Sequence, residues 1–140
     1  MKILILEDDG QEDKRMPHFR QRIKELEEMG GVKIELVHVE TAADCIAELK
    51  KINNENERFN LIFLDHDLGG KVYVDTNRED TGSEVARWMN ENLEKLYGAS
   101  VITHTFNSAG AKNITSLVPQ SVYIPGIWGK EIFHKIVKIV

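Results

Sequence analysis

The sequence predicts a three-layer α/β domain built around a parallel sheet. Five short apolar runs alternate with five helical patterns along the chain. The run "NLIFL" at 60–64 is almost wholly apolar, as expected of a strand buried on both faces of a parallel sheet. Because strands that alternate with helices pack as one sheet between two helix layers, with right-handed crossovers, we expect that architecture here.

Each element has its own signal in the sequence. Strands are predicted at residues 2–6, 33–39, 60–64, 99–103 and 121–124. Helices are predicted at residues 12–29, 42–56, 83–95, 109–117 and 130–137. Thr41 precedes Asp44 by three residues, which is the spacing of a capping box at a helix start. Thr81 precedes Glu84 in the same way, and the glycines at 30–31 suit a helix end.

Length and composition are typical of a globular protein. The chain has 140 residues, 41% hydrophobic and 29% charged, which predicts one domain over residues 1–140. A net charge of -5 argues against a general nucleic-acid coat, because phosphate neutralisation needs a basic surface, but it permits an enzyme that holds one nucleotide or RNA end. The single Cys45 and the lack of a membrane-length apolar run or signal peptide favour a cytoplasmic protein with no membrane partner.

Ionisable and polar side chains follow three of the predicted strands, at the edge where open parallel sheets bind ligands. They are Glu7, Asp8 and Asp9 after the first strand, Asp65, His66 and Asp67 after the third, and His104, Thr105 and Asn107 after the fourth. Acids after one strand are most simply explained as helix caps or solvated groups, but acids after two neighbouring strands repel each other and favour a cation. Oxygen ligands with few nitrogens and no sulfur predict Mg²⁺ or Mn²⁺.

These residues resemble those of a response-regulator receiver domain. The run "ILILEDD", an aspartate ending the third strand and a threonine after the fourth carry the resemblance. It implies a flavodoxin-like fold with strand order 2-1-3-4-5. It also implies that Glu7 and Asp8 form the acidic pair and that Asp65 is the phosphoacceptor. Asp67 would offer its backbone carbonyl to the metal, and Thr105 would take the hydroxyl position.

Departures from the receiver pattern matter as much as the matches. A receiver carries a lysine before a proline at the end of the fifth strand, whereas this chain has Ile124 before Pro125. The hydrophobic-proline step after the phosphoacceptor is replaced by "HDLGG". Two histidines, His66 and His104, are added at the strand ends.

This altered set is similar to the cyclic-phosphate processing receiver-like domains. The matching segments are the acids at 7–9, "HDLG" at 66–69, and the histidine–hydroxyl–x–asparagine segment at 104–107. The resemblance implies hydrolysis of cyclic phosphates, either 2′,3′-cyclic RNA ends or a cyclic nucleotide signal. The expected activity is therefore a metal-dependent cyclic phosphodiesterase with a nucleotide or RNA end as its substrate.

The chemistry of cyclic-phosphate opening assigns expected roles. A metal held by Glu7, Asp8 and Asp65 would neutralise phosphoryl charge and activate water. His66 or His104 would act as general acid or base, since histidine titrates near neutral pH. Thr105 and Asn107 would hydrogen-bond a phosphoryl oxygen near the start of the fourth helix. A covalent route through Asp65 stays open.

Two other functions are compatible with the sequence. One is a degenerate receiver that accepts or senses phosphate, against which the missing lysine argues. The other is a phosphate- or nucleotide-binding module without catalysis, against which the retained acids and histidines argue. The connection at 69–82 is long, as functional lids often are, and its Lys71 and Arg78 could reach the strand ends, although loop charges are most often only solvated.

Overall fold

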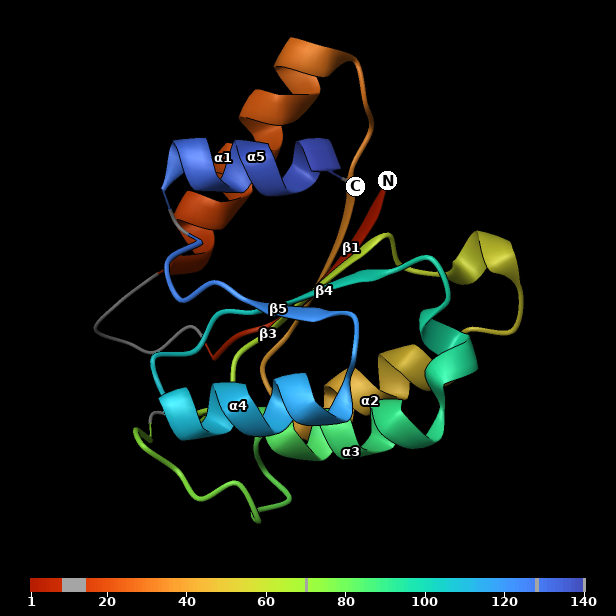
Figure 1. Ribbon diagram of the computed structural model, residues 1–140. Helices are drawn as coiled ribbons and strands as arrows, with labels where there is room; N and C mark the ends of the chain where they lie inside the picture. Colours follow the sequence, from red (N-terminus) through yellow and green to blue (C-terminus); the bar gives the residue numbers. More distant parts are fainter. Residues whose placement is uncertain (9–14, 70, 128, 140) are drawn as a thin grey trace.

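A computed structural model describes residues 1–8, 15–69, 71–127 and 129–139. Its five parallel strands lie in the order β2-β1-β3-β4-β5 (Figure 1). The strands are β1 Lys2–Leu6, β2 Glu35–Val39, β3 Leu61–Leu64, β4 Ser100–Thr103 and β5 Ser121–Tyr123. The predicted fold class and strand order are confirmed, and every strand starts and ends within two residues of its predicted bounds.

The helices cover both faces of the sheet. They are α1 Arg15–Gly30, α2 Ala42–Lys50, α3 Gly82–Glu91, α4 Ser108–Leu117 and α5 Lys130–Ile139, with short 3₁₀ helices at Glu55–Glu57 and Leu93–Leu96. In Figure 1, α1 and α5 lie on one side of the sheet and α2, α3 and α4 on the other. No helix in the described part of the chain is long and apolar enough to cross a membrane.

The alternation of side chains along each strand divides the core into two halves. On β1, Leu4 and Leu6 belong to the half that packs against α2, α3 and α4. Ile3 and Ile5 belong to the half that packs against α1 and α5, where Phe19 and Phe133 are fully buried. Because successive strand residues point to opposite faces, one continuous apolar strand supplies both halves.

Two predicted helices extend too far. The helix predicted at 42–56 ends at Lys50, and the one predicted at 83–95 ends at Glu91. Asparagine explains both ends, because its side chain competes for backbone hydrogen bonds. Asn54 accepts a hydrogen bond from the Asn56 N–H at 3.0 Å and starts a separate 3₁₀ turn. Asn92 leaves helical geometry, with φ -134° and ψ 41°.

The two predicted caps behave differently. Thr41 Oγ1 accepts a hydrogen bond from the Asp44 N–H at 3.1 Å, so the cap of α2 is confirmed. The capping box predicted for Thr81 is wrong, because its hydroxyl donates to the Arg78 carbonyl at 2.9 Å and makes no cap hydrogen bond. The loop carbonyl therefore outcompetes the helix N–H groups for this hydroxyl.

Gly82, the first residue of α3, lies against the end of β3. A Cβ built on Gly82 would lie 2.0 Å from the Asp65 carbonyl oxygen, and the Gly82 N–H donates to the His66 carbonyl at 3.0 Å. Only glycine fits this approach, so the return of the long loop holds the backbone of Asp65 in place.

We expect Gly82→Ala to destabilise the protein by about 1–3 kcal/mol or more, because backbone rather than a flexible side chain opposes the new methyl group. Urea unfolding of parent and variant measures this change. Gly126→Ala is the matched control, since no atom lies within 4 Å of its built Cβ. Equal stability of the two variants would show that α3 moves away from β3 without cost.

Candidate functional site

The register of the sheet puts three ionisable residues at one level. The Asp65 N–H donates to the Leu6 carbonyl at 3.1 Å, one residue beyond the end of β3. The His104 N–H donates to the Leu64 carbonyl at 3.0 Å, one residue beyond the end of β4. Aligned residues of parallel strands point to the same face. Glu7, Asp65 and His104 therefore project toward the face that α1 and α5 cover.

These three side chains form a buried cluster. One ligand atom from each of Glu7, Asp65 and His104 lies within 4.8 Å of the others. Glu7 and His104 are 0% exposed and Asp65 is 5% exposed. His104 Nε2 lies 2.8 Å from Glu7 Oε2, so the imidazole and the carboxylate share a hydrogen bond. Two of the predicted metal ligands thus come together, and His104 is the third potential ligand.

Arg15 is a site residue that the sequence analysis missed. Its Nη2 atom lies 2.6 Å from Glu7 Oε1, and its side chain is 22% exposed. The available signal was helical spacing, because Arg15 lies one turn before the buried Phe19 on α1. A guanidinium therefore already neutralises part of the charge of the buried Glu7.

Burial sets the protonation of the other two groups. It raises the pKa of Asp65 from 3.8 to about 6, with the nearby Glu7 charge acting in the same direction and His104 and Arg15 opposing it. Burial also lowers the pKa of His104 from 6.5 to about 4. At neutral pH the imidazole is neutral, which is the form that binds metals.

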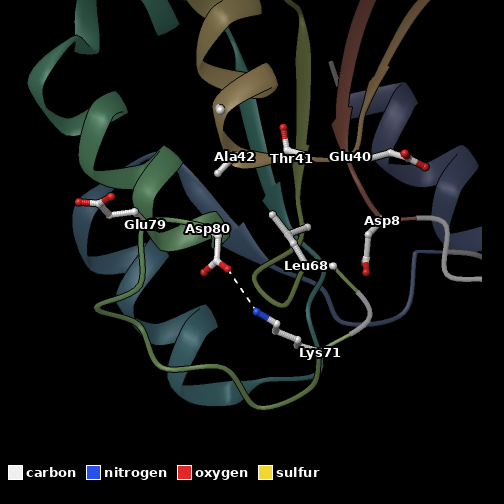
Figure 2. A pocket seen from close by; sticks show the side chains of 10 residues that line it. Asp8, Glu40, Thr41, Ala42, Leu68, Lys71, Glu79 and Asp80 are labelled. Atoms are coloured by element: carbon white, nitrogen blue, oxygen red, sulfur yellow. Dashed lines mark ion pairs between the residues drawn. The ribbon is translucent and has the colours of Figure 1, made fainter.

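Asp8 lies apart from the cluster. It lines a cleft of about 440 Å³ between the start of α2 and the loop after β3 (Figure 2). Leu68, Lys71 and Asp80 line the same cleft, and Lys71 Nζ lies 3.5 Å from Asp80 Oδ2. The predicted metal ligand Asp8 therefore contributes no atom to the described three-residue group. Asp9, the further predicted acid, lies outside the described residues.

Asp67 and Asn107 connect the long loop to the segment after β4. Asp67 Oδ2 accepts from the Tyr73 N–H at 2.5 Å, and its Oδ1 accepts from the Val74 N–H at 3.1 Å. Asn107 Nδ2 donates to Asp67 Oδ1 at 3.0 Å and to the Val74 carbonyl at 3.1 Å. We call these hydrogen bonds the Asp67–Asn107 clamp. The Asp67 carboxylate is thus committed to the loop, while the metal role predicted for its backbone carbonyl stays a prediction.

The side chain of His66 contacts the Asp67 carboxylate of the clamp. Its side chain is fully buried, and its Nδ1 lies 2.7 Å from Asp67 Oδ1. A Cβ on Gly110 would lie 2.3 Å from His66 Cγ, so α4 packs directly on the ring. His66 is therefore outside the three-residue cluster, in a position that suits orienting Asp67 better than the proton transfer expected from sequence.

The two predicted phosphate-binding residues hydrogen-bond within their own segment. Thr105 Oγ1 accepts from the Asn107 N–H at 3.1 Å, which leaves its O–H proton as a donor. Asn107 Oδ1 accepts from the Gly110 N–H at 3.0 Å and caps α4, a common role of asparagine at a helix start. Asn107 therefore uses both ends of its amide inside the protein.

The end of β5 is apolar. Ile124 packs against the core half beneath α1 and α5, and its N–H donates to the Thr103 carbonyl at 2.9 Å. An apolar side chain therefore stands at position 124, and the cation that the described contacts place at the cluster is Arg15.

Comparison with known proteins identifies a family for the chain. The profile of the cyclic-phosphate processing receiver domain matches residues 3–120. No curated protein sequence matches the chain.

Several solved structures share the fold at low sequence identity. The response regulator TrrA from Thermotoga maritima, in complex with Mg²⁺ and BeF, is 20% identical, with 99% and 98% of the two chains covered and a TM-score of 0.59. The Mn²⁺-bound response regulator Rcp1 is 20% identical, with 99% and 91% covered and a TM-score of 0.56. The phosphorylated cyanobacterial phytochrome response regulator RcpA is 20% identical, with 99% and 89% covered and a TM-score of 0.61.

We expect Asp65→Asn to stabilise the metal-free protein at pH 7. The folded state binds the Asp65 proton more tightly than the unfolded chain does, so stability is lost as the pH rises from about 4 to 6. A pKa raised from 3.8 to about 6 lowers the free energy of unfolding at pH 7 by about 3 kcal/mol. The neutral amide of the Asp65→Asn variant avoids this loss. Urea unfolding in EDTA measures the change, with the exposed Glu94→Gln as the control.

The same variant exposes the opposite contribution of His104. The pKa of His104 is lowered in the folded state, so between pH 6.5 and about 4 this histidine is protonated in the unfolded chain but not in the folded chain. The free energy of unfolding therefore falls as the pH falls through this range. In the parent, the contributions of Asp65 and His104 to the pH dependence of stability oppose each other. Asp65→Asn should show the His104 contribution without that of Asp65. An Asp65→Asn variant that is less stable than the parent at pH 7 would contradict a raised pKa of Asp65 in the folded state.

Proposed function

The chain belongs to the cyclic-phosphate processing receiver domain family, and on that premise we propose that it is a metal-dependent phosphoesterase that opens cyclic phosphates. The observation that carries the proposal is the buried group of Glu7, Asp65 and His104, whose ligand atoms lie within 4.8 Å of one another. Water adds across a ring P–O bond in this reaction, which yields a phosphate monoester and a free ribose hydroxyl.

The residues of the cluster fit a divalent cation. Two buried carboxylates need a counter-charge, and His104 is in its neutral, ligating form. Two structural neighbours were solved with Mg²⁺ or Mn²⁺ bound. Because an imidazole replaces one oxygen ligand, we favour Mn²⁺ over Mg²⁺. Bound there, the cation supplies charge neutralisation for a phosphoryl oxygen and a more acidic water.

Arg15 and Thr105 are the proposed phosphate ligands. Arg15 lies at the cluster, and its planar guanidinium matches a pair of phosphate oxygens. Thr105 keeps an O–H donor next to His104 in the chain. The side chain of Ile124, at the position of a receiver's strand-5 lysine, is apolar and packs against the core.

The histidines take different roles from those expected from sequence. A pKa of about 4 keeps His104 from forming an imidazolium general acid at pH 7, so we propose it as a metal ligand. His66 is proposed as a positioning residue for Asp67, given their 2.7 Å contact. Asp65 either completes the ligand set or attacks phosphorus itself.

The substrate and the binding partners are also proposed. A nucleotide or RNA end is the proposed substrate, with no bulk nucleic-acid binding because the net charge is -5. A single domain over residues 1–140 and a cytoplasmic location stay predictions from the sequence.

We expect His104→Gln to weaken Mn²⁺ binding by at least about 10- to 100-fold, since even outer-shell changes at metal sites cost that much. Turnover of adenosine 2′,3′-cyclic phosphate at fixed Mn²⁺ should fall with it. Calorimetric titration without substrate measures the affinity, with the exposed His18→Gln as the control. Unchanged Mn²⁺ affinity together with lost turnover would restore the acid–base role expected from sequence.

Incubation with acetyl phosphate distinguishes a phosphoesterase from a receiver that stores a phosphoryl group. We expect no stable phosphoryl adduct after incubation with acetyl phosphate and Mn²⁺, because the apolar Ile124 cannot hold the group. Intact-mass measurement of parent and Asp65→Asn tests this. One stoichiometric phosphoryl group on the parent, absent from the variant, would favour the degenerate receiver.

A further inference from the structure

Two large aromatic side chains are exposed where the long loop meets the segment after β4. Phe106 is 66% exposed, although its neighbours Thr105 and Asn107 are buried. Tyr73 is 78% exposed. Phe106 follows His104 of the buried cluster by only two residues, so this aromatic surface lies at the edge of the sheet that carries the site.

The clamp defined above fixes the two aromatic residues relative to each other. Asp67 accepts hydrogen bonds from the N–H groups of Tyr73 and Val74, and Asn107 donates to the Val74 carbonyl. Because Phe106 directly precedes Asn107, one hydrogen-bond network carries both aromatic residues on its flanks. Figure 1 shows the loop beside the start of α4, in agreement with these contacts.

Tyr73 is held in a conformation that its side chain disfavours. Its φ is +51°, and among the described non-glycine residues it is the one with positive φ. Such a backbone is disfavoured for a residue with a side chain and persists only where surrounding contacts impose it. The two hydrogen bonds to Asp67 impose it here, and they leave the ring outside the core.

We propose that Phe106 and Tyr73 form a base-binding platform and that the substrate is a mononucleoside cyclic phosphate. This inference rests on the proposed function, because it places the phosphate at Glu7, Asp65 and His104 and the base on the aromatic rings. Aromatic faces stack on every nucleobase, which strengthens binding by about 5- to 150-fold per base.

The charges around the site select a single nucleotide over a longer strand. The neighbouring cleft is lined by Asp8, Glu40, Glu79 and Asp80, with Lys71 as a cation already paired to Asp80. A polynucleotide backbone laid along these carboxylates would be repelled, whereas one phosphate at the Arg15 end of the site would not. The platform therefore recognises one base, and the acidic lining of the neighbouring cleft disfavours a longer strand.

The test compares binding of adenosine 3′-phosphate, ribose 5-phosphate and inorganic phosphate by calorimetry in Mn²⁺. The parent should bind the adenosine ligand at least about tenfold more tightly than ribose 5-phosphate. Phe106→Ala and Tyr73→Ala should each remove most of that preference without changing the affinity for inorganic phosphate, and Phe106→Trp should retain it. Tyr97→Ala is the control, since Tyr97 is 75% exposed and lies just before β4, at the opposite edge of the sheet.

The outcomes separate the two proposals. Binding of inorganic phosphate with equal affinities for the adenosine and ribose ligands would overturn the platform alone. No binding of any of the three ligands would overturn the proposed function, and the platform with it. Tighter binding of an oligoribonucleotide ending in a 3′-phosphate than of adenosine 3′-phosphate would overturn the preference for a single nucleotide.

Discussion

Two buried carboxylates at neighbouring strand ends are the constraint around which the site is arranged. Glu7 and Asp65 are almost completely removed from water, and burial of like charges is costly unless a counter-charge lies close by. Arg15 supplies that counter-charge at Glu7, and His104 adds a hydrogen bond. His38 holds the Glu7 backbone through a 2.8 Å contact to its carbonyl. Burial, with the Glu7 charge acting in the same direction, still raises the pKa of Asp65 to about 6.

The described contacts around the site hold the backbone and the long loop in place. Gly82 presses α3 against the Asp65 carbonyl, and Gly110 lets α4 lie on the His66 ring. His66 in turn contacts Asp67, whose carboxylate binds two N–H groups of the long loop. The polar residues after β3 therefore divide into Asp65, which faces the cluster, and a His66–Asp67 pair that anchors the loop. This division follows from the alternation of side-chain direction at the end of a strand.

In the proposed function, the loop and the segment after β4 supply the part of the site that recognises the rest of the substrate. A cation held by the three-residue cluster would neutralise a phosphate, but it would not distinguish one phosphate ester from another. Tyr73 and Phe106 provide exposed aromatic surface on the flanks of one hydrogen-bond network. The contacts that hold Tyr73 at positive φ come from the carboxylate of Asp67, the residue whose backbone carbonyl the receiver pattern would place near a metal. Here the acid has become part of the support for the loop.

The sequence by itself determined the fold and the edge of the sheet that carries the site. Alternating apolar runs and helical patterns specify a parallel sheet between helices, because burial on both faces requires continuous apolar strands. The residues after β1, β3 and β4 could also be named in advance, since the carboxyl ends of parallel strands share one edge. Helix ends at Lys50 and Glu91 were missed, because asparagine side chains decide them through local hydrogen bonds.

Only the tertiary structure decided which of those residues meet. Glu7 and Asp8 are neighbours, yet Glu7 enters the cluster and Asp8 lines the cleft, because adjacent residues at a strand end point to different sides. His104 joins Glu7 and Asp65 through the register of three strands that are distant in sequence, and register is a property of the paired sheet rather than of any one segment. Arg15 reaches Glu7 because α1 packs across β1; the helical spacing between Arg15 and Phe19 indicates which face of α1 Arg15 lies on, but it does not specify Glu7 as the partner.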